Sequence, residues 1–222
     1  RHTTLKEQKY IKSICDALGR EVVFENIAEV LTRQGIEVDI NNIPDGYIDE
    51  NNVIHIGYTV YNPVQFILKH ELTHFGEGTE AYTAFIEAVQ SSKAYLKWLQ
   101  KKTGSTSDSL GKLEGLYREA VMKSREKTAP VGAAKAQAEI FADFCGDMMF
   151  TERGLKSLAK AVEAKHRPKV IQYILDFFAY LKQKLSGNKQ FTMEIARLES
   201  KYAEMLRAAN ETSTDNKPIG CG

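Results

Sequence analysis

The distribution of β-strand patterns along the chain limits what it can fold into. Every segment with the alternation or the β-branched composition of a strand lies before residue 59, and helical periodicity follows. The candidate strands are 21–24, 36–40, and a hairpin of 46–48 and 53–58 that turns on residues 49–52. The sequence therefore predicts an α+β fold with a small N-terminal three-stranded sheet and a mainly helical C-terminal part.

Helical periodicity divides the rest of the chain. The expected helices are 5–18, 27–34, 64–75, 80–102, 113–127, 133–150, 170–185 and 191–210. We expect a domain over 1–150 that contains a helical insertion at about 79–128, and a helical extension over 151–210. The polar residues 211–222 are expected to form a flexible tail.

Composition excludes several classes of function. The 222 residues include 30 basic and 29 acidic side chains, so bulk charge does not favour nucleic-acid binding. Three cysteines are too few for a disulfide framework. The longest apolar stretch, 170–181, is too short to span a membrane, so we expect a soluble protein with no membrane partner. Because the chain begins with Arg1, we also expect it to be part of a longer protein.

The segment His70-Glu71-Leu72-Thr73-His74 fits the HExxH motif and falls inside an expected helix. Histidines at positions i and i+4 lie on one helix face, so both imidazoles can reach one zinc ion. Glu71 is placed to take a proton from an attacking water. The sequence therefore predicts one catalytic zinc ion, with His70 and His74 as ligands and Glu71 as general base.

Catalytic zinc needs a third protein ligand, and two candidates compete. Glu139 and Asp143 are four residues apart on one expected helix, where Glu139 could bind the metal and Asp143 could orient a ligand histidine. Glu80 stands where the metzincin pattern HExxHxxGxxH places its last ligand, but Glu77 replaces the glycine of that pattern. We therefore expect Glu139 to be the ligand and Glu80 to lie at a helix start.

Five residues resemble the gluzincin pattern HExxH…ExxxD: His70, Glu71, His74, Glu139 and Asp143. The resemblance covers about residues 36–150, although the gap between the two motifs is longer than in compact members. The chain also resembles zincin domains embedded in large phage or mobile-element proteins of bacteria. This implies a zincin-like fold in which a sheet lies above the two active-site helices.

The resemblance further implies a zinc-dependent endopeptidase that acts on a protein or peptide, with the parent polypeptide as a further candidate substrate. Residues 53–58 would form the sheet edge that binds substrate in extended form. The oxyanion-stabilising residue is not assigned among Tyr82, Tyr117, His55 and His166, and His55 is expected to face solvent. A bacterial cytoplasmic location is the default, with release from the cell left open.

A second hypothesis is a non-catalytic zinc-binding interaction module of a larger protein. It is motivated by the long helical part, for which the sequence indicates no chemical role. The aromatic residues Tyr173, Phe177, Phe178 and Tyr180 are expected to form core packing, and Cys145 to be a small buried hydrophobe.

Overall fold

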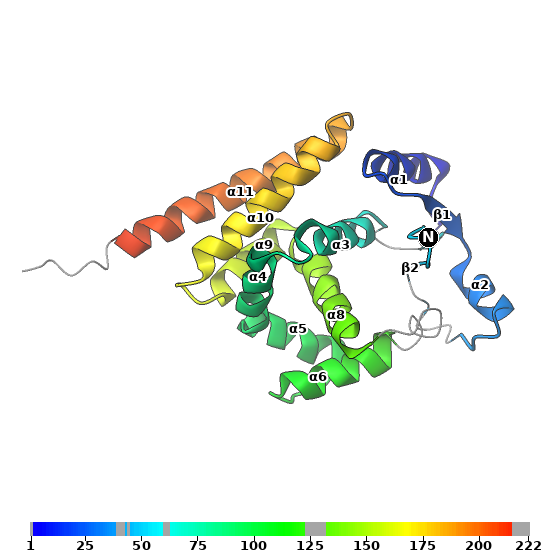
Figure 1. Ribbon diagram of the computed structural model, residues 1–222, viewed down its shortest axis with the longest axis horizontal. Coiled ribbons are helices and arrows are strands. Elements are labelled where there is room, and N and C mark those ends of the chain that lie inside the picture. Colours follow the sequence, from blue (N-terminus) through cyan, green and yellow to red (C-terminus); the bar gives the residue numbers. More distant parts are fainter. Residues whose placement is uncertain (1, 39–42, 44, 60–62, 123–131, 215–222) are drawn as a thin grey trace, which may run out of the picture. The chain divides into compact units, whose positions relative to one another are not determined.

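The computed structural model describes residues 2–38, 43, 45–59, 63–122 and 132–214 (Figure 1). It has the predicted α+β composition, with one three-stranded sheet and mostly helices in the described residues. The chain divides into two compact units. The first comprises Arg1–His74 and Lys97–Gly146, and the second comprises Phe75–Leu96 and Asp147–Gly222.

The sheet belongs to the first unit and has the order β1-β3-β2. Strand β1 (Val22–Glu25) pairs in parallel with β3 (Ile54–Gly57), and β2 (Gly46–Ile48) pairs with β3 in antiparallel. The predicted hairpin is confirmed, but the expectation that its second strand forms the sheet edge is wrong, because β1 covers that side. In the described sheet, β3 is therefore the central strand, and β1 and β2 are the outer ones.

Residues 36–38 do not form the expected strand, and residues 39–40 lie outside the described part. The hairpin turn does form as expected: the Asp49 carboxylate accepts hydrogen bonds from the backbone N–H groups of Asn51 and Val53, at 2.8 and 3.0 Å. Asn52 completes the turn with a φ of 61°, a conformation that asparagine tolerates well.

The helices of the first unit follow the predicted pattern with some changes at their ends. They are α1 (Leu5–Ala17), α2 (Ile27–Arg33), α3 (Pro63–Gly76), α5 (Lys93–Thr103), α6 (Leu110–Tyr117), the π-helix η2 (Arg118–Met122) and α8 (Ala133–Met148). Helices α3, α5 and α8 each continue for a few residues into the second unit. The helix expected over 113–127 begins earlier, at Leu110, and changes to π geometry at Arg118. Residues 123–127 lie outside the described part.

One long helix was expected over 80–102, but the structure has two, α4 (Glu80–Gln90) and α5. Two serines cause the break, since their hydroxyls compete for backbone hydrogen bonds. Ser91 donates to the Glu87 carbonyl at 2.6 Å, and the Ser92 hydroxyl accepts from the Tyr95 N–H at 3.4 Å.

The described part of the second unit is helical. Helix α10 (Arg167–Lys184) packs against α4, α9 (Glu152–Ala161) and α11 (Lys189–Thr214). The expected aromatic packing is confirmed: Tyr173, Phe177 and Phe178 are buried, and Tyr180 stacks on Phe177. Helix α9 was not expected, and residues 211–214 are helical rather than part of a tail. The rest of the predicted tail lies outside the described residues.

Candidate metal centre

Helix α3 presents two different faces in the HExxH segment. Ile67, Leu68 and Leu72 are at most 2% exposed and form its core face. Glu71 follows Ile67 by four residues and Leu68 by three, so its carboxylate falls on the same buried side. His70, by contrast, is half-buried, and the next turn of the helix is more open.

His70 and His74 converge through their ring nitrogens. The two Nε2 atoms lie 3.1 Å apart, and the rings stand nearly perpendicular at 83°. Two imidazole ligands of one tetrahedral zinc, each at about 2.05 Å, have nitrogens about 3.3 Å apart. The observed separation therefore fits two adjacent ligand positions of a zinc ion.

The environment of His70 favours the uncharged ring. Burial lowers the pKa of His70 to about 3, and the positive charges of His74 and Arg20 act in the same direction. Metal ions bind the neutral imidazole, so a histidine that is unprotonated at neutral pH keeps its lone pair available. The electrostatics of the helix therefore agree with a metal-ligand role for His70.

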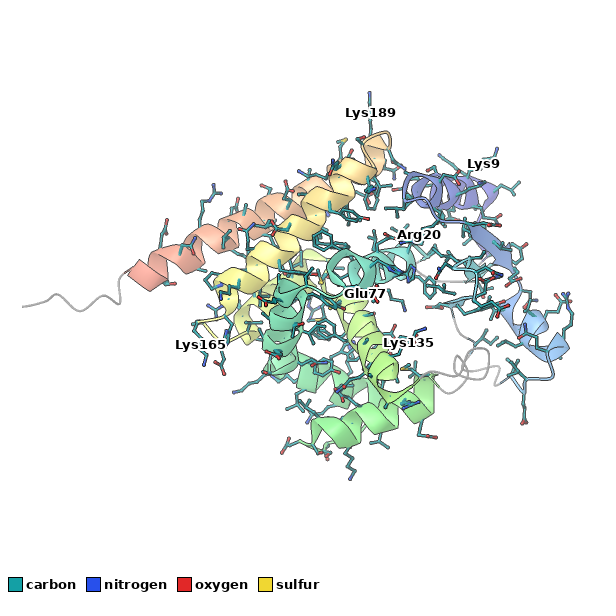
Figure 2. All side chains as sticks on the ribbon, viewed as in Figure 1. Lys9, Arg20, Glu77, Lys135, Lys165 and Lys189 are labelled. Atoms are coloured by element: carbon teal, nitrogen blue, oxygen red, sulfur yellow. The ribbon has the colours of Figure 1, made fainter. Side chains whose placement is uncertain are left out.

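Glu71 is a buried carboxylate with two unlike oxygens. Its side chain is 1% exposed, and Oε1 accepts a hydrogen bond from Arg20 Nε at 2.8 Å. Figure 2 labels Arg20, which follows α1 and whose side chain extends toward α3. Glu71 Oε2 is also buried, but the described structure gives it no hydrogen-bond partner. A buried carboxylate oxygen in this condition indicates a site that takes a further donor, such as water.

The second predicted motif also lies on a partly buried face. Ile140, Phe141 and Phe144 are buried and form the core side of helix α8. Asp143 on the same helix is 7% exposed, and it accepts hydrogen bonds from Lys69 Nζ at 2.6 Å and from the Tyr117 hydroxyl at 2.8 Å.

Two of the predicted roles are affected by these contacts. Tyr117, considered as an oxyanion stabiliser, donates its hydroxyl to Asp143 in the core. Asp143 connects α8 to α3 through Lys69, the residue before the first histidine. Its expected contact with a ligand histidine stays a prediction.

The structure does not assemble the complete predicted ligand set. No group of three or more His, Cys, Asp or Glu side chains is arranged to hold a metal within the described ranges. Glu139 is half-buried on α8, one turn before Asp143, and its role as third ligand stays a prediction. Glu80 lies in the first turn of α4 behind the N-cap Thr79, as expected of a helix-start carboxylate.

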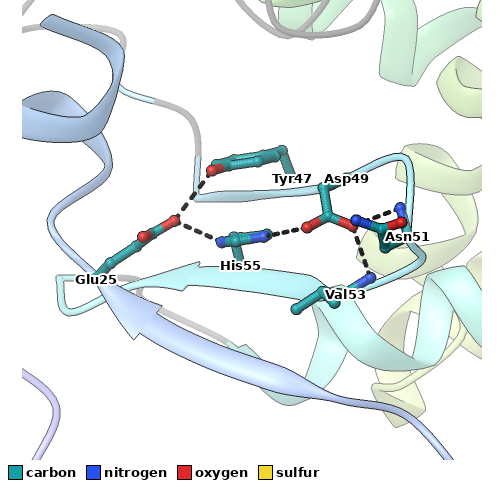
Figure 3. Close-up of polar contacts among 6 residues, drawn as sticks. All are labelled: Glu25, Tyr47, Asp49, Asn51, Val53 and His55. Carbon is teal, nitrogen blue, oxygen red and sulfur yellow. Dashed lines mark hydrogen bonds and ion pairs between the residues drawn. The ribbon is translucent and has the colours of Figure 1, made fainter. Parts of the chain in front are cut away.

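A polar cluster on the sheet was missed from the sequence (Figure 3). His55 was expected to face solvent, but its side chain is only 15% exposed and lies between two carboxylates. Its Nδ1 is 2.6 Å from Glu25 Oε1, and its Nε2 is 2.8 Å from Asp49 Oδ2. The Tyr47 ring stacks on the imidazole, and its hydroxyl donates to Glu25 at 3.1 Å. The cluster thus connects all three strands.

The cluster changes the acidity of two members. The hydrogen bond from His55 is the main reason why the pKa of Asp49 falls below its usual value of 3.8. Burial, followed by the charge of Glu25, raises the pKa of Tyr47 to about 12. The alternation of the hairpin could have placed Tyr47 and His55 on one face, but the pairing with β1 that brings in Glu25 has no local signal.

The remaining sequence expectations concern cysteine and membrane spans. Cys145 is fully buried, as predicted, and burial raises its pKa well above the ordinary thiol value. Cys15 is also buried, with a pKa raised to about 12 chiefly by burial. Within the helices that the structure describes, none has the length and apolar character needed to cross a membrane.

Comparison of the chain with protein-family models, with curated proteins and with solved structures gives no match. Function therefore has to be inferred from the residues of the site. The described geometry brings together a histidine pair suited to a metal ion and an adjacent buried glutamate.

Proposed function

We propose that this protein is a zinc-dependent endopeptidase. The observation that carries the proposal is the 3.1 Å separation of His70 Nε2 and His74 Nε2. Glu71, the residue after His70 in the sequence, is a buried carboxylate. The resemblance of the same residues to the gluzincin motif agrees with this reading. The proposed site holds one zinc ion, with His70 and His74 as two of its ligands.

Glu139 is the proposed third ligand. Lys69, which precedes His70, binds Asp143 on α8, and the same lysine lies against Gly146 of that helix. A Cβ atom at position 146 would lie 3.3 Å from the Lys69 Cβ, so the backbones approach closely there. Glu139 stands one helical turn before Asp143, on the face that these contacts direct toward α3.

The proposed reaction divides the work between the metal and the chain. Zinc supplies Lewis acidity, which favours deprotonation of water and polarises a peptide carbonyl. Glu71 Oε2 accepts a proton from the attacking water, since this oxygen has no other described hydrogen-bond partner. The glutamate then donates the proton to the leaving amine. The burial of Glu71 protects this proton transfer from bulk water.

The proposed substrates are proteins or peptides. By the resemblance to zincin domains of phage and mobile-element proteins, we propose a bacterial cytoplasmic location. Neither nucleic acid nor a membrane is a proposed partner.

The experiment combines metal analysis with a cleavage assay on an unfolded protein such as reduced casein. Wild-type protein should contain about one zinc ion per chain and cleave the substrate. Glu71→Gln should keep the metal and lose at least about a hundredfold in rate. Glu139→Ala should release zinc, whereas the matched control Glu80→Ala should not. Loss of zinc from the Glu80 variant alone would refute the proposed ligand set.

A second candidate is a non-catalytic zinc-binding interaction module. One observation favours it: Glu71 is 1% exposed and already bound by Arg20, which limits the access of a substrate to this carboxylate. Full zinc occupancy, combined with no cleavage of casein or of other unfolded proteins, would support the module and contradict the peptidase.

A further inference from the structure

The contact between Arg20 and Glu71 joins residues 51 positions apart in the sequence. Glu71 lies on the core face of α3 because it stands four residues after Ile67 and three after Leu68, which are both buried. An isolated buried carboxylate is strongly disfavoured, so a charged donor is needed at this position. Arg20 supplies it through a 2.8 Å hydrogen bond, and its own side chain is 23% exposed.

The backbone at Arg20 is fixed by the end of helix α1. Gly19 has a φ of +70°, and its N–H donates to the Asp16 carbonyl at 3.1 Å, while the Arg20 N–H donates to the Cys15 carbonyl at 2.8 Å. These two bonds form a Schellman motif, which reverses the chain direction after the helix. Cys15 is fully buried, so the motif is attached to the core of the first unit.

The arginine contacts only one of the two carboxylate oxygens. Arg20 Nε binds Oε1, while the buried Oε2 has no hydrogen-bond partner in the described structure. A carboxylate held at one oxygen has a restricted side-chain rotation, and the other oxygen keeps a fixed direction. This is the arrangement needed by a base that must meet a proton at a defined position.

We propose that Arg20 is the positioning residue of Glu71. It fixes the carboxylate through Oε1 so that Oε2 stays available to accept the proton of the attacking water. The inference rests on the proposed peptidase function and extends it to a residue outside the HExxH motif. Arg20 acts only through Glu71 and does not bind the metal.

The test compares wild-type protein with Arg20→Ala, Arg20→Lys and a matched surface control, Arg33→Ala. Arg33 is 73% exposed and pairs with Glu29 on its own helix. Arg20→Ala should lower kcat about 10- to 100-fold and leave KM within about twofold, because a displaced base slows the chemical step. Arg20→Lys should recover at least part of the loss, since the ammonium can still donate to Oε1, and Arg33→Ala should match the wild type.

A metal probe supplies a readout that does not depend on turnover. Each variant is loaded with Co²⁺, whose visible absorption band is sensitive to the groups around its ligands. Arg20→Ala should change this band in the same direction as Glu71→Gln, with Co²⁺ affinity within about threefold of wild type. In the Glu71→Gln background, Arg20→Ala should leave the band unchanged, because coupled residues act as a unit.

Several results would overturn the role of Arg20. An unchanged kcat in Arg20→Ala would show that the contact is not needed, and an increased kcat would make Arg20 an inhibitory contact instead. A band change that persists in the Glu71→Gln background would show that Arg20 acts independently. Failure of the peptidase proposal would give a different result, because the wild type itself would then bind no Co²⁺ or cleave no substrate. Circular dichroism would show that both the wild type and Arg20→Ala are folded.

Discussion

The two units differ in how they use buried charge. Among the described residues, the buried carboxylates are Glu71 and Asp143, and both lie in the first unit. Glu71 pairs with Arg20 at 2.8 Å, and Asp143 pairs with Lys69 at 2.6 Å. In the second unit the buried polar residue is Ser92, and its core is built mainly from aromatic and aliphatic side chains.

The buried ion pairs of the first unit share one helix. A buried ion pair often stabilises a fold no more than apolar residues of the same volume would. In the second unit, Phe177, Phe178 and Tyr202 are fully buried, and its described residues include no buried ion pair. Both ion pairs of the first unit involve helix α3, which carries the histidine pair.

The largest effect that would test this comparison is expected at Asp143. Asp143→Asn removes the negative charge but keeps the shape of the side chain, and it leaves Lys69 without its counter-charge. Removing one partner of a buried ion pair lowers the free energy of unfolding by about 3–5 kcal/mol. We therefore expect a loss of this size in the free energy of unfolding, measured by urea denaturation.

The matched control lies in the second unit, where Lys182 binds Glu199 at 2.6 Å with side chains that are 33% and 27% exposed. Glu199→Gln should cost no more than about 1 kcal/mol, because water screens this pair. Equal losses in Asp143→Asn and Glu199→Gln would remove the distinction between the two units.

The sequence was informative where structure depends on near neighbours. The i, i+4 spacing of His70 and His74 predicted that their rings converge, because a helix places those positions on one face. The same periodicity predicted the buried sides of α3 and α8. The separation of an N-terminal sheet from later helices was equally visible, since alternation and helical spacing are local patterns.

The missed features depend on distant partners. Arg20 and Glu71 are 51 residues apart, and Lys69 and Asp143 are 74 apart, so no window of sequence contains either pair. Strand β3 is central only because β1 adds in parallel from an earlier segment. The His55 cluster needs the same pairing, since Glu25 comes from β1. Local patterns thus find the helix of the proposed metal site but not the distant residues that pair with it.

An intermediate effect should appear in the acid stability of the first unit. The pKa of Asp49 is lowered in the folded state, mainly by its hydrogen bond from His55. A lowered folded pKa means that the unfolded chain binds the proton more readily. The stabilisation is therefore present above the usual value of 3.8 and is lost as the pH falls through the lower, folded value.

Thermal unfolding between pH 7 and pH 2.5 measures this effect. Asp49→Asn should have a lower Tm than wild type at pH 7, and the gap should narrow below about pH 4 as wild-type Asp49 takes up its proton. Asp16→Asn serves as control, because Asp16 is 61% exposed and contacts Lys12 on the same helix. A gap for Asp49→Asn that stays constant over the whole pH range would contradict the proposed electrostatic role of the His55 cluster.

The smallest expected effect is the loss of stability when a glycine with a positive φ angle is replaced by alanine. It helps to separate backbone strain from a role in the proposed site. Gly19 and Gly78 both have positive φ angles, +70° and +77°, and a Cβ atom at either position would meet nothing within 4 Å. Alanine should therefore cost about 1 kcal/mol at each site through the left-handed backbone alone. Gly115→Ala in helix α6, which also has open space, should instead stabilise by about 0.5–1 kcal/mol.

The loss of stability would not distinguish Gly19→Ala from Gly78→Ala, but the Co²⁺ absorption band of the proposed site should. Gly19 directs the chain so that Arg20 reaches Glu71, whereas Gly78 precedes α4 in the second unit. Gly19→Ala should therefore change the Co²⁺ absorption band in the same sense as Arg20→Ala, while Gly78→Ala should leave it unchanged. If both alanine variants have equal stability and the same unaltered band, then the turn after α1 contributes only to folding. A change confined to Gly19→Ala would instead show that a single backbone conformation outside the motif sets the position of the proposed base.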